Sequence, residues 1–126
     1  MSEPIVYVDT SSVREGKLEQ VKLEIKKLVA FIDENVPKAI YYAIYLDAEG
    51  KTMSVAQSQP SSDALEEHMQ IGGPAFREFI ELITLKSIDV YGTPSPSLMQ
   101  KLEQKAEMLG GATVRVHPLE GGFFRF

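Results

Sequence analysis

The spacing of apolar and polar positions changes several times along the chain, and each change marks the boundary of a predicted element. Residues 4–9 form a short run rich in β-branched side chains, which predicts a first strand. Ser12 and Glu15 then have the spacing of a capping box at a helix start. The apolar residues that follow recur at steps of three and four, so we expect a long helix over residues 13–35 that ends before Pro37.

A hairpin is predicted next, because two β-rich runs are separated by a short turn. The strands cover residues 39–46 and 51–58. Helical spacing returns at Asp63, which we expect to cap a short helix that reaches about residue 70 and breaks at Gly72–Pro74. The remaining predicted segments are a helical one over residues 76–83, a strand over 85–91, a helix capped by Ser95 and stopped by Gly110, and extended segments over 112–117 and 122–126.

The order of these elements predicts the fold class. It runs strand, helix, strand, strand, helix, strand, and then adds a helix and a strand. The first six match the ferredoxin-like pattern, an α+β class in which an antiparallel sheet carries its helices on one face. We expect a single domain over residues 1–126, with a core over 4–92 and a C-terminal helix-and-strand extension over 93–126.

The second predicted strand is apolar on both of its faces. Alternate positions place Ile40, Tyr42, Ile44 and Leu46 on one face and Ala39, Tyr41, Ala43 and Tyr45 on the other. One layer of helices covers only one face of a sheet, so the second face needs another cover. We expect that cover to be a second copy of the chain, with the phenylalanine-rich segment 121–126 docked across a homodimer. The alternative is that this tail folds back on its own sheet.

Composition narrows the classes of function. The chain has 126 residues, no cysteine, a net charge of −5 and no Lys/Arg cluster. Nucleic acid is not an expected partner, because that affinity comes mainly from neutralised phosphates. No run reaches the roughly 18 apolar residues of a membrane span, and residues 1–4 do not have the pattern of a signal peptide. We therefore expect no membrane partner and a cytoplasmic location.

His68 is the main candidate for chemistry. It lies beside Leu65 and Met69 on the short predicted helix, where it could face a pocket between helix and sheet. A neutral imidazole can accept or donate a proton near pH 7. The alternative is a histidine that only packs or caps. The second histidine, His117, precedes a proline at the end of a late strand, where we expect it to pack in the tail.

A ligand pocket is predicted around His68. Tyr42 is its first candidate, because it lies on the strand face assigned to the helices and combines an apolar ring with a hydroxyl that needs a partner. The predicted lining residues are Tyr42, Met69, Phe76, Phe79 and Tyr91. No metal site is predicted, because the chain has no thiolate ligands and no His-Glu-x-x-His motif.

The residues around His68 also resemble those of a known family. Residues 45–47 (Y-L-D) at the end of a hairpin strand, followed by residues 62–68 (S-D-A-L-E-E-H), are similar to the antibiotic biosynthesis monooxygenase domain. In that family a hairpin leads into a helix with an alanine and, four residues later, a histidine. Ala64 and His68 match this pattern, and the resemblance covers residues 5–91.

The resemblance implies a dimeric α+β barrel with a pocket between sheet and helices in each subunit. The family includes cofactor-free oxygenases that act on quinols or polyketide aromatics, and haem-degrading enzymes that use an asparagine, a tryptophan and a histidine. Haem degradation is not expected here, because the chain has no tryptophan. The first hypothesis is therefore a cofactor-free monooxygenase of a small aromatic or quinol compound, with His68 as proton acceptor and Tyr42 orienting the substrate. The competing hypothesis is a non-catalytic homodimer that binds a small ligand or a partner protein.

Overall fold

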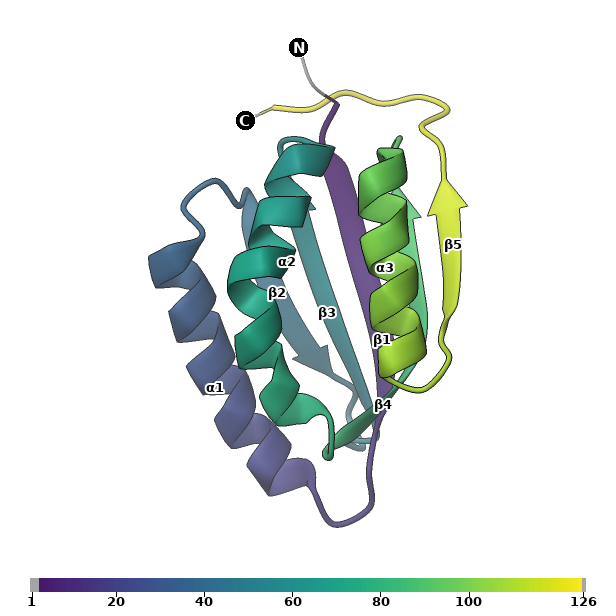
Figure 1. Cartoon of the computed structure of the whole chain (residues 1–126). Helices are drawn as coiled ribbons and strands as arrows, with labels where there is room; N and C mark the ends of the chain where they lie inside the picture. Colours follow the sequence, from purple (N-terminus) through teal and green to yellow (C-terminus); the bar gives the residue numbers. More distant parts are fainter. Residues whose placement is uncertain (1–2, 126) are drawn as a thin grey trace.

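A five-stranded sheet forms the frame of the molecule (Figure 1). The computed structural model describes residues 3–125. The strands are β1 (Ile5–Val13), β2 (Tyr41–Leu46), β3 (Thr52–Gln59), β4 (Ile83–Tyr91) and β5 (Thr113–His117), in the spatial order β2-β3-β1-β4-β5. The first four are antiparallel, as predicted, whereas β5 pairs parallel to β4. The sheet is therefore mixed, because a helix between β4 and β5 returns the chain in its original direction.

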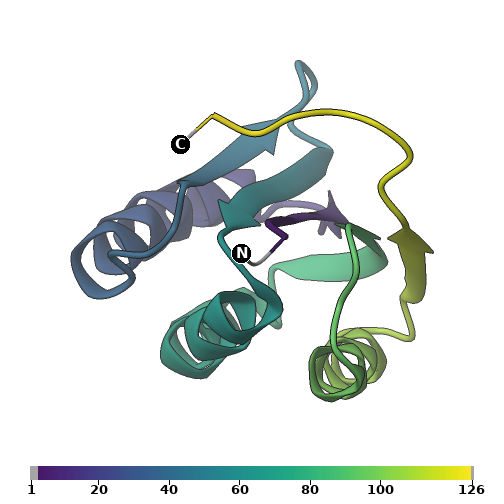
Figure 2. The same cartoon turned by 90° about the horizontal axis from the view of Figure 1, so that it is seen from above.

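The α-helices described within residues 3–125 all pack on the same face of this sheet (Figure 2). They are α1 (Leu18–Asn35), α2 (Ser62–Phe76) and α3 (Pro96–Met108), and a short 3-10 helix, η1 (Arg77–Phe79), follows α2. Each helix buries one apolar stripe against the strands. This is the ferredoxin-like α+β layout predicted from the order of elements, extended by α3 and β5.

The boundary between β1 and α1 differs from the prediction. β1 continues to Val13, which pairs with β4, and α1 begins only at Leu18. The predicted capping box at Ser12 is therefore wrong, because the helix N-cap is Lys17 and makes no side-chain capping bond. Ser11 reads as a turn residue in the sequence, yet it is fully buried within β1. Pairing with two neighbouring strands overrides the local turn preference at this point.

α2 is also longer than predicted. The expected break at Gly72–Pro74 is wrong, because the helix continues to Phe76 with Pro74 inside it. Pro74 lies in the last turn, where its missing N–H costs only one hydrogen bond of the helix. Gly72 faces α1, and a Cβ atom there would lie 2.9 Å from Ile32 Cδ1. The glycine therefore serves the close packing of two helices and does not end α2.

Serine side chains cap α2 and α3. Ser61 caps α2 by accepting a hydrogen bond from the backbone N–H of Ala64 at 3.1 Å, so the predicted cap at Asp63 is wrong. Ser95 caps α3 as predicted and accepts a hydrogen bond from the backbone N–H of Leu98 at 3.1 Å. Both bonds satisfy amides that have no partner within the helix.

The C-terminal segments agree in part with the prediction. β5 confirms the extended segment predicted over residues 112–117. Residues 122–125 form no strand, and Phe126, the end of the other predicted segment, lies outside the described residues. The tail runs along the side of the sheet opposite the helices (Figure 2). Phe123 and Phe124 are 70% and 48% exposed there.

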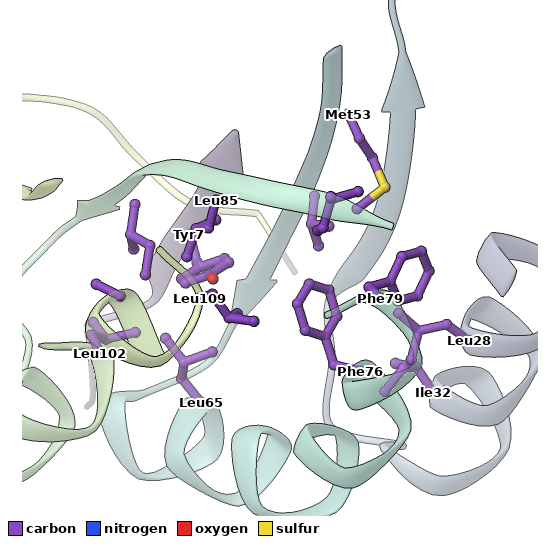
Figure 3. Packing of buried hydrophobic residues seen from close by; sticks show 14 of the residues in the cluster. Tyr7, Leu28, Ile32, Met53, Leu65, Phe76, Phe79, Leu85, Leu102 and Leu109 are labelled. Carbon is purple, nitrogen blue, oxygen red and sulfur yellow. The ribbon is translucent and has the colours of Figure 1, made fainter. Parts of the chain in front are cut away.

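The hydrophobic core fills the space between the sheet and the helices (Figure 3). Leu65 of α2 and Leu102 of α3 have no exposed surface and belong to the same cluster as Met53 of β3 and Leu85 of β4. Each such side chain contributes about 1.5–3 kcal/mol relative to an exposed one. These contacts fix the positions of α2 and α3 relative to the sheet.

The opposite face of the sheet carries no helix, and β2 presents aromatic side chains on it. Tyr41 and Tyr45 are 44% and 60% exposed. Tyr42, between them in the strand, is half-buried and packs against the core. Over β2 the predicted division into two faces is confirmed, with Tyr42 on the helix side, whereas it is wrong for the two residues before the strand, because Ala39 packs against the core and Ile40 is exposed.

Candidate functional site

A cavity of about 480 Å³ lies between the inner face of the sheet and the helices. Its volume falls within the roughly 300–1,000 Å³ of pockets that hold small molecules. The lining is largely apolar, and its aromatic and polar members include Tyr7, Tyr42, Gln57, His68, Phe76 and Lys105. Three strands and two helices supply these six side chains. The cavity therefore depends on the packing of α2 and α3 onto the sheet.

The structure brings together four of the six side chains predicted for this site, His68, Tyr42, Met69 and Phe76, around the cavity. Phe79 is fully buried and stacks on Phe76 with ring centroids 5.2 Å apart, outside the lining. Tyr91 lies at the end of β4, where it stacks on His117 with ring centroids 4.5 Å apart. Those two side chains line a separate surface depression.

His68 is buried in the wall of the cavity. Only 7% of its surface is exposed, and its ring lies 5.4 Å from that of Tyr42 between centroids. Burial, and then the positive charge of Lys105, lower the pKa of His68 from 6.5 to about 4. Desolvation disfavours the imidazolium form, so the ring is neutral at pH 7. One of its nitrogens therefore carries a lone pair and the other a proton.

Two buried glutamines extend from His68 along the sheet. Gln59 Nε2 donates to Gln57 Oε1 at 2.9 Å, and Gln57 Nε2 lies 3.2 Å from His68 Nε2. Because Gln57 Oε1 accepts from Gln59, the amide N–H of Gln57 faces the histidine and donates to His68 Nε2. The lone pair of the neutral ring is then on Nε2 and its proton on Nδ1. His68 Nδ1 and Gln59 Oε1 are the two ends of this row, and both are buried without a hydrogen-bond partner in the protein. Buried polar atoms without partners are rare, which sets this row apart from ordinary core packing.

A second cluster of polar side chains lies beside the cavity, where Lys105 of α3 contacts Tyr7 and Asp9 of β1. Lys105 Nζ lies 2.7 Å from the hydroxyl oxygen of Tyr7 and 3.4 Å from Asp9 Oδ2, and the Tyr7 hydroxyl donates to Asp9 Oδ2 at 2.7 Å. The Asp9 side chain is fully buried and that of Lys105 is 19% exposed. Burial, followed by the negative charge of Asp9, raises the pKa of Tyr7, so its hydroxyl stays protonated. Lys105 Nζ also lies 4.5 Å from the centroid of the Phe76 ring.

Sequence reasoning missed this second group. Lys105 and Tyr7 are 98 positions apart in the chain, and nothing in their local patterns connects them. One signal was present: Tyr7, Asp9 and Ser11 occupy alternate positions, so all three share the inner face of β1. Polar residues on the buried face of a strand need partners, and such a row can be used to locate a polar site.

Other classes of site find little support in the part of the chain that the structure describes. Over residues 3–125, no three or more His, Cys, Asp or Glu side chains are grouped so that they could hold a metal ion. None of the helices described there is both long and apolar enough to cross a membrane.

The layers, strand order and cavity define the class of the protein as α+β with a ferredoxin-like layout and a ligand-sized pocket between sheet and helices. The sequence matches no protein-family model, and no curated protein matches it at a significant level.

Solved structures share this fold. MupZ from Pseudomonas fluorescens has a TM-score of 0.75 at 15% identity, over 98% of this chain and 96% of that protein. A "putative antibiotic biosynthesis monooxygenase" from Caulobacter crescentus has a TM-score of 0.62 at 20% identity, over 71% of this chain and 88% of that protein. SnoaB, a cofactor-independent oxygenase from Streptomyces nogalater, has a TM-score of 0.62 at 12% identity, over 75% of this chain and 96% of that protein. At these identities the likeness establishes the fold. The resemblance to the antibiotic biosynthesis monooxygenase domain found in the sequence is therefore confirmed for the fold.

Proposed function

We propose that this protein is a monooxygenase that binds a small aromatic or quinol compound in the cavity and oxidises it with dioxygen, without a metal or organic cofactor. The observation that carries the proposal is His68, a buried imidazole that is neutral at pH 7 in the wall of a cavity of ligand size. SnoaB is described as a cofactor-independent oxygenase and has the same fold, which supports the reaction class.

The substrate supplies the electrons in this reaction. Loss of a proton from an electron-rich phenol or enol gives an anion that can pass an electron to dioxygen. For an activated methylene carbon the overall change is CH2 + O2 → C=O + H2O. Both C–H bonds break, one oxygen atom becomes the carbonyl oxygen and the other leaves as water, and the electrons that reduce dioxygen come from that carbon. His68 accepts the first proton, and the largely apolar lining keeps water away from the anion.

Tyr42 has the properties of an orienting group in this proposal. Its side chain lines the cavity, and its ring is tilted by 41° against the ring of His68. Burial, and then the charge of Asp9, raise the pKa of Tyr42, so the hydroxyl is a hydrogen-bond donor at neutral pH. Phe76 and Met69 add apolar surface against which an aromatic ring can pack.

Two histidine variants test the proposal as a matched pair. His68→Gln alters the cavity, and His117→Gln alters the second histidine, which lies outside the cavity lining. Oxygen consumption and product absorbance are measured with anthrone and a naphthohydroquinone as probes, against buffer alone. We expect His68→Gln to lower kcat/KM by about 100-fold or more and His117→Gln to leave it unchanged. Equal rates for His68→Gln and the wild type, or no acceleration over buffer by the wild type, would overturn the proposal.

One detail of His68 favours a second function. Its Nε2 is engaged by Gln57, and its Nδ1 is buried without a partner, so Nε2 must release Gln57 before it can accept a proton from a ligand. The alternative that we propose is a non-catalytic protein that binds the same class of aromatic ligand. A ligand that binds the folded state raises its melting temperature. Anthrone that raises the melting temperature without consumption of oxygen supports this alternative against the oxygenase.

We also propose that two chains form a homodimer through the face of the sheet that carries no helix. The exposed side chains of Tyr41, Tyr45 and Phe123 lie on β2 and the tail, and apolar surface of this extent is usually covered by a partner. Tyr45→Glu should dissociate the dimer in sedimentation velocity runs at micromolar concentration. Leu23→Glu, on an exposed part of α1, is the matched control and should not. A wild-type protein that sediments as a monomer contradicts this part of the proposal.

A further inference from the structure

The C-terminal extension supplies part of the cavity wall. Within the single domain that we propose, α3 belongs to the segment 93–126 that follows the core over residues 4–92. Lys101, Gln104 and Lys105 of this helix all line the cavity. The buried residues Leu102 and Ala106 alternate with them and hold the helix against the core. The extension therefore adds polar and charged groups to those that the core supplies, such as His68 and Arg77.

The cavity lining is more positive than the rest of the protein. Its cationic side chains are Arg77, Lys101 and Lys105, and its one carboxylate is Glu66. The whole chain has the opposite balance, with a net charge of −5. Glu66 is paired with Lys101 at 3.2 Å. Arg77 forms no ion pair among residues 3–125. Lys105 is paired with Asp9 behind the lining at 3.4 Å, so the excess of positive charge is that of Arg77.

Lys105 is the most buried of these cations. Its ammonium has three N–H donors, of which Tyr7 and Asp9 accept two, at 2.7 Å and 3.4 Å. The third has no acceptor among the described residues, and Lys105 lines the cavity next to Phe76. Its side chain is 19% exposed, so its charge is only weakly screened by water. An ionised oxygen in the cavity would complete the hydrogen bonds of this ammonium.

We propose that the cavity takes its ligand as an anion, in which the ionised oxygen of a phenol or an enol accepts a hydrogen bond from Lys105 Nζ. This inference rests on the proposed function for the aromatic nature of the ligand, and it names the ligand class as compounds with an acidic ring hydroxyl. His68 and Lys105 then divide the work, because the neutral imidazole receives the proton and the ammonium holds the anion. An opposite charge within about 4–6 Å lowers the pKa of an acid by roughly 1–3 units.

Other titratable groups surround the cavity next to Lys105, so the binding of two ligands must be compared at one fixed pH. Those groups are Tyr7 and Asp9 of β1, Tyr42 of β2, Glu66 and His68 of α2, Arg77 of η1 and Lys101 of α3. At one pH their charges are the same for two ligands that differ only in the ionisable hydroxyl. A difference between such ligands therefore reports the interaction with the anion.

The experiment uses para-nitrophenol as the ionisable probe and para-nitroanisole as its neutral twin. Binding is measured by equilibrium dialysis, and the pKa of bound nitrophenol follows from the absorbance of its phenolate. Lys105→Met alone leaves Asp9 buried without its partner, so the double variant Asp9→Asn/Lys105→Met removes both charges together. Lys105→Arg keeps the positive charge. Lys22→Met makes the same exchange at an exposed site on α1.

We expect the wild type to bind nitrophenolate about 10- to 100-fold more tightly than nitroanisole and to lower the pKa of the bound phenol by roughly 1–2 units. The double variant should lose both effects, whereas Lys105→Arg and Lys22→Met should keep them. Equal binding of the two probes by the wild type, an unchanged preference in the double variant, or no saturable binding of nitrophenol would each overturn the inference. Turnover is not needed for this result. If the protein prefers the phenolate but consumes no oxygen, the proposed oxygenase activity is wrong and the inference about anion binding holds. If it consumes oxygen but shows no preference for the phenolate, the inference is wrong and the proposed activity holds.

Discussion

The burial of His68 makes a prediction about stability that does not depend on any activity. The pKa of His68 falls from 6.5 to about 4 in the folded protein. The unfolded chain therefore binds this proton more readily, and the contribution of His68 to stability is complete above pH 6.5 and is lost as the pH falls towards 4. A shift of this size corresponds to about 3 kcal/mol in total, of which about 2 kcal/mol is lost by pH 5.

Urea denaturation of the wild type and of His68→Gln measures this effect. Carboxylates also titrate between pH 7 and pH 5, but they do so in both proteins, so the difference between the two free energies of unfolding isolates His68. The glutamine retains a polar group that can reach Gln57 and has no charged form. We expect the advantage of the wild type over the variant to shrink by about 2 kcal/mol from pH 7 to pH 5. A difference that stays constant over this range refutes the argument that burial keeps the ring neutral.

Three further variants test the packing that positions the site. Leu102→Ala removes a side chain with no exposed surface beneath α3 and should lower the free energy of unfolding by about 2–5 kcal/mol in urea melts; a loss below about 1 kcal/mol would contradict the packing. Ser95→Ala removes the cap of α3 and should cost about 1 kcal/mol, and no measurable loss would show that water replaces the cap. Gly50→Ala should lower the melting temperature, because Gly50 has a φ of 70° and a Cβ atom there would lie 2.6 Å from Leu18 Cδ2; an unchanged melting temperature would show that the turn adapts.

The order of elements could be predicted because each rests on a strong local pattern. The hairpin and the α3 helix with its Ser95 cap are examples, and both are found as expected. The errors occur where tertiary contacts outweigh local preference. Ser11 is a poor strand residue on its own, but the strand continues through it because β3 and β4 pair on both sides. Gly72 resembles a helix stop, but it is a helix packing position against Ile32.

The candidate site could be predicted only in the part that one helix and one strand supply. His68 and Met69 are neighbours on α2, and the alternation of β2 places Tyr42 on the helix side, so these residues meet in the cavity. Lys105 and Tyr7 meet through the packing of α3 on the sheet, over 98 positions of sequence. No single-sequence pattern contains that contact, because it depends on how the C-terminal helix crosses the sheet.

The inner face of the sheet is where stability and ligand binding place opposite demands on the sequence. On β4, away from the cavity lining, the buried positions Leu85, Ile88 and Val90 are apolar. On β1 and β3, which border the cavity, the same face buries Asp9 and Gln59, each with an oxygen atom that has no hydrogen-bond partner in the protein. Each such atom costs about 1–3 kcal/mol, a cost that apolar residues there would avoid, as β4 demonstrates. Packing alone does not account for these polar residues, whereas the proposed binding and deprotonation of a ligand would, because such a site needs fixed dipoles and charges in a space from which water is excluded.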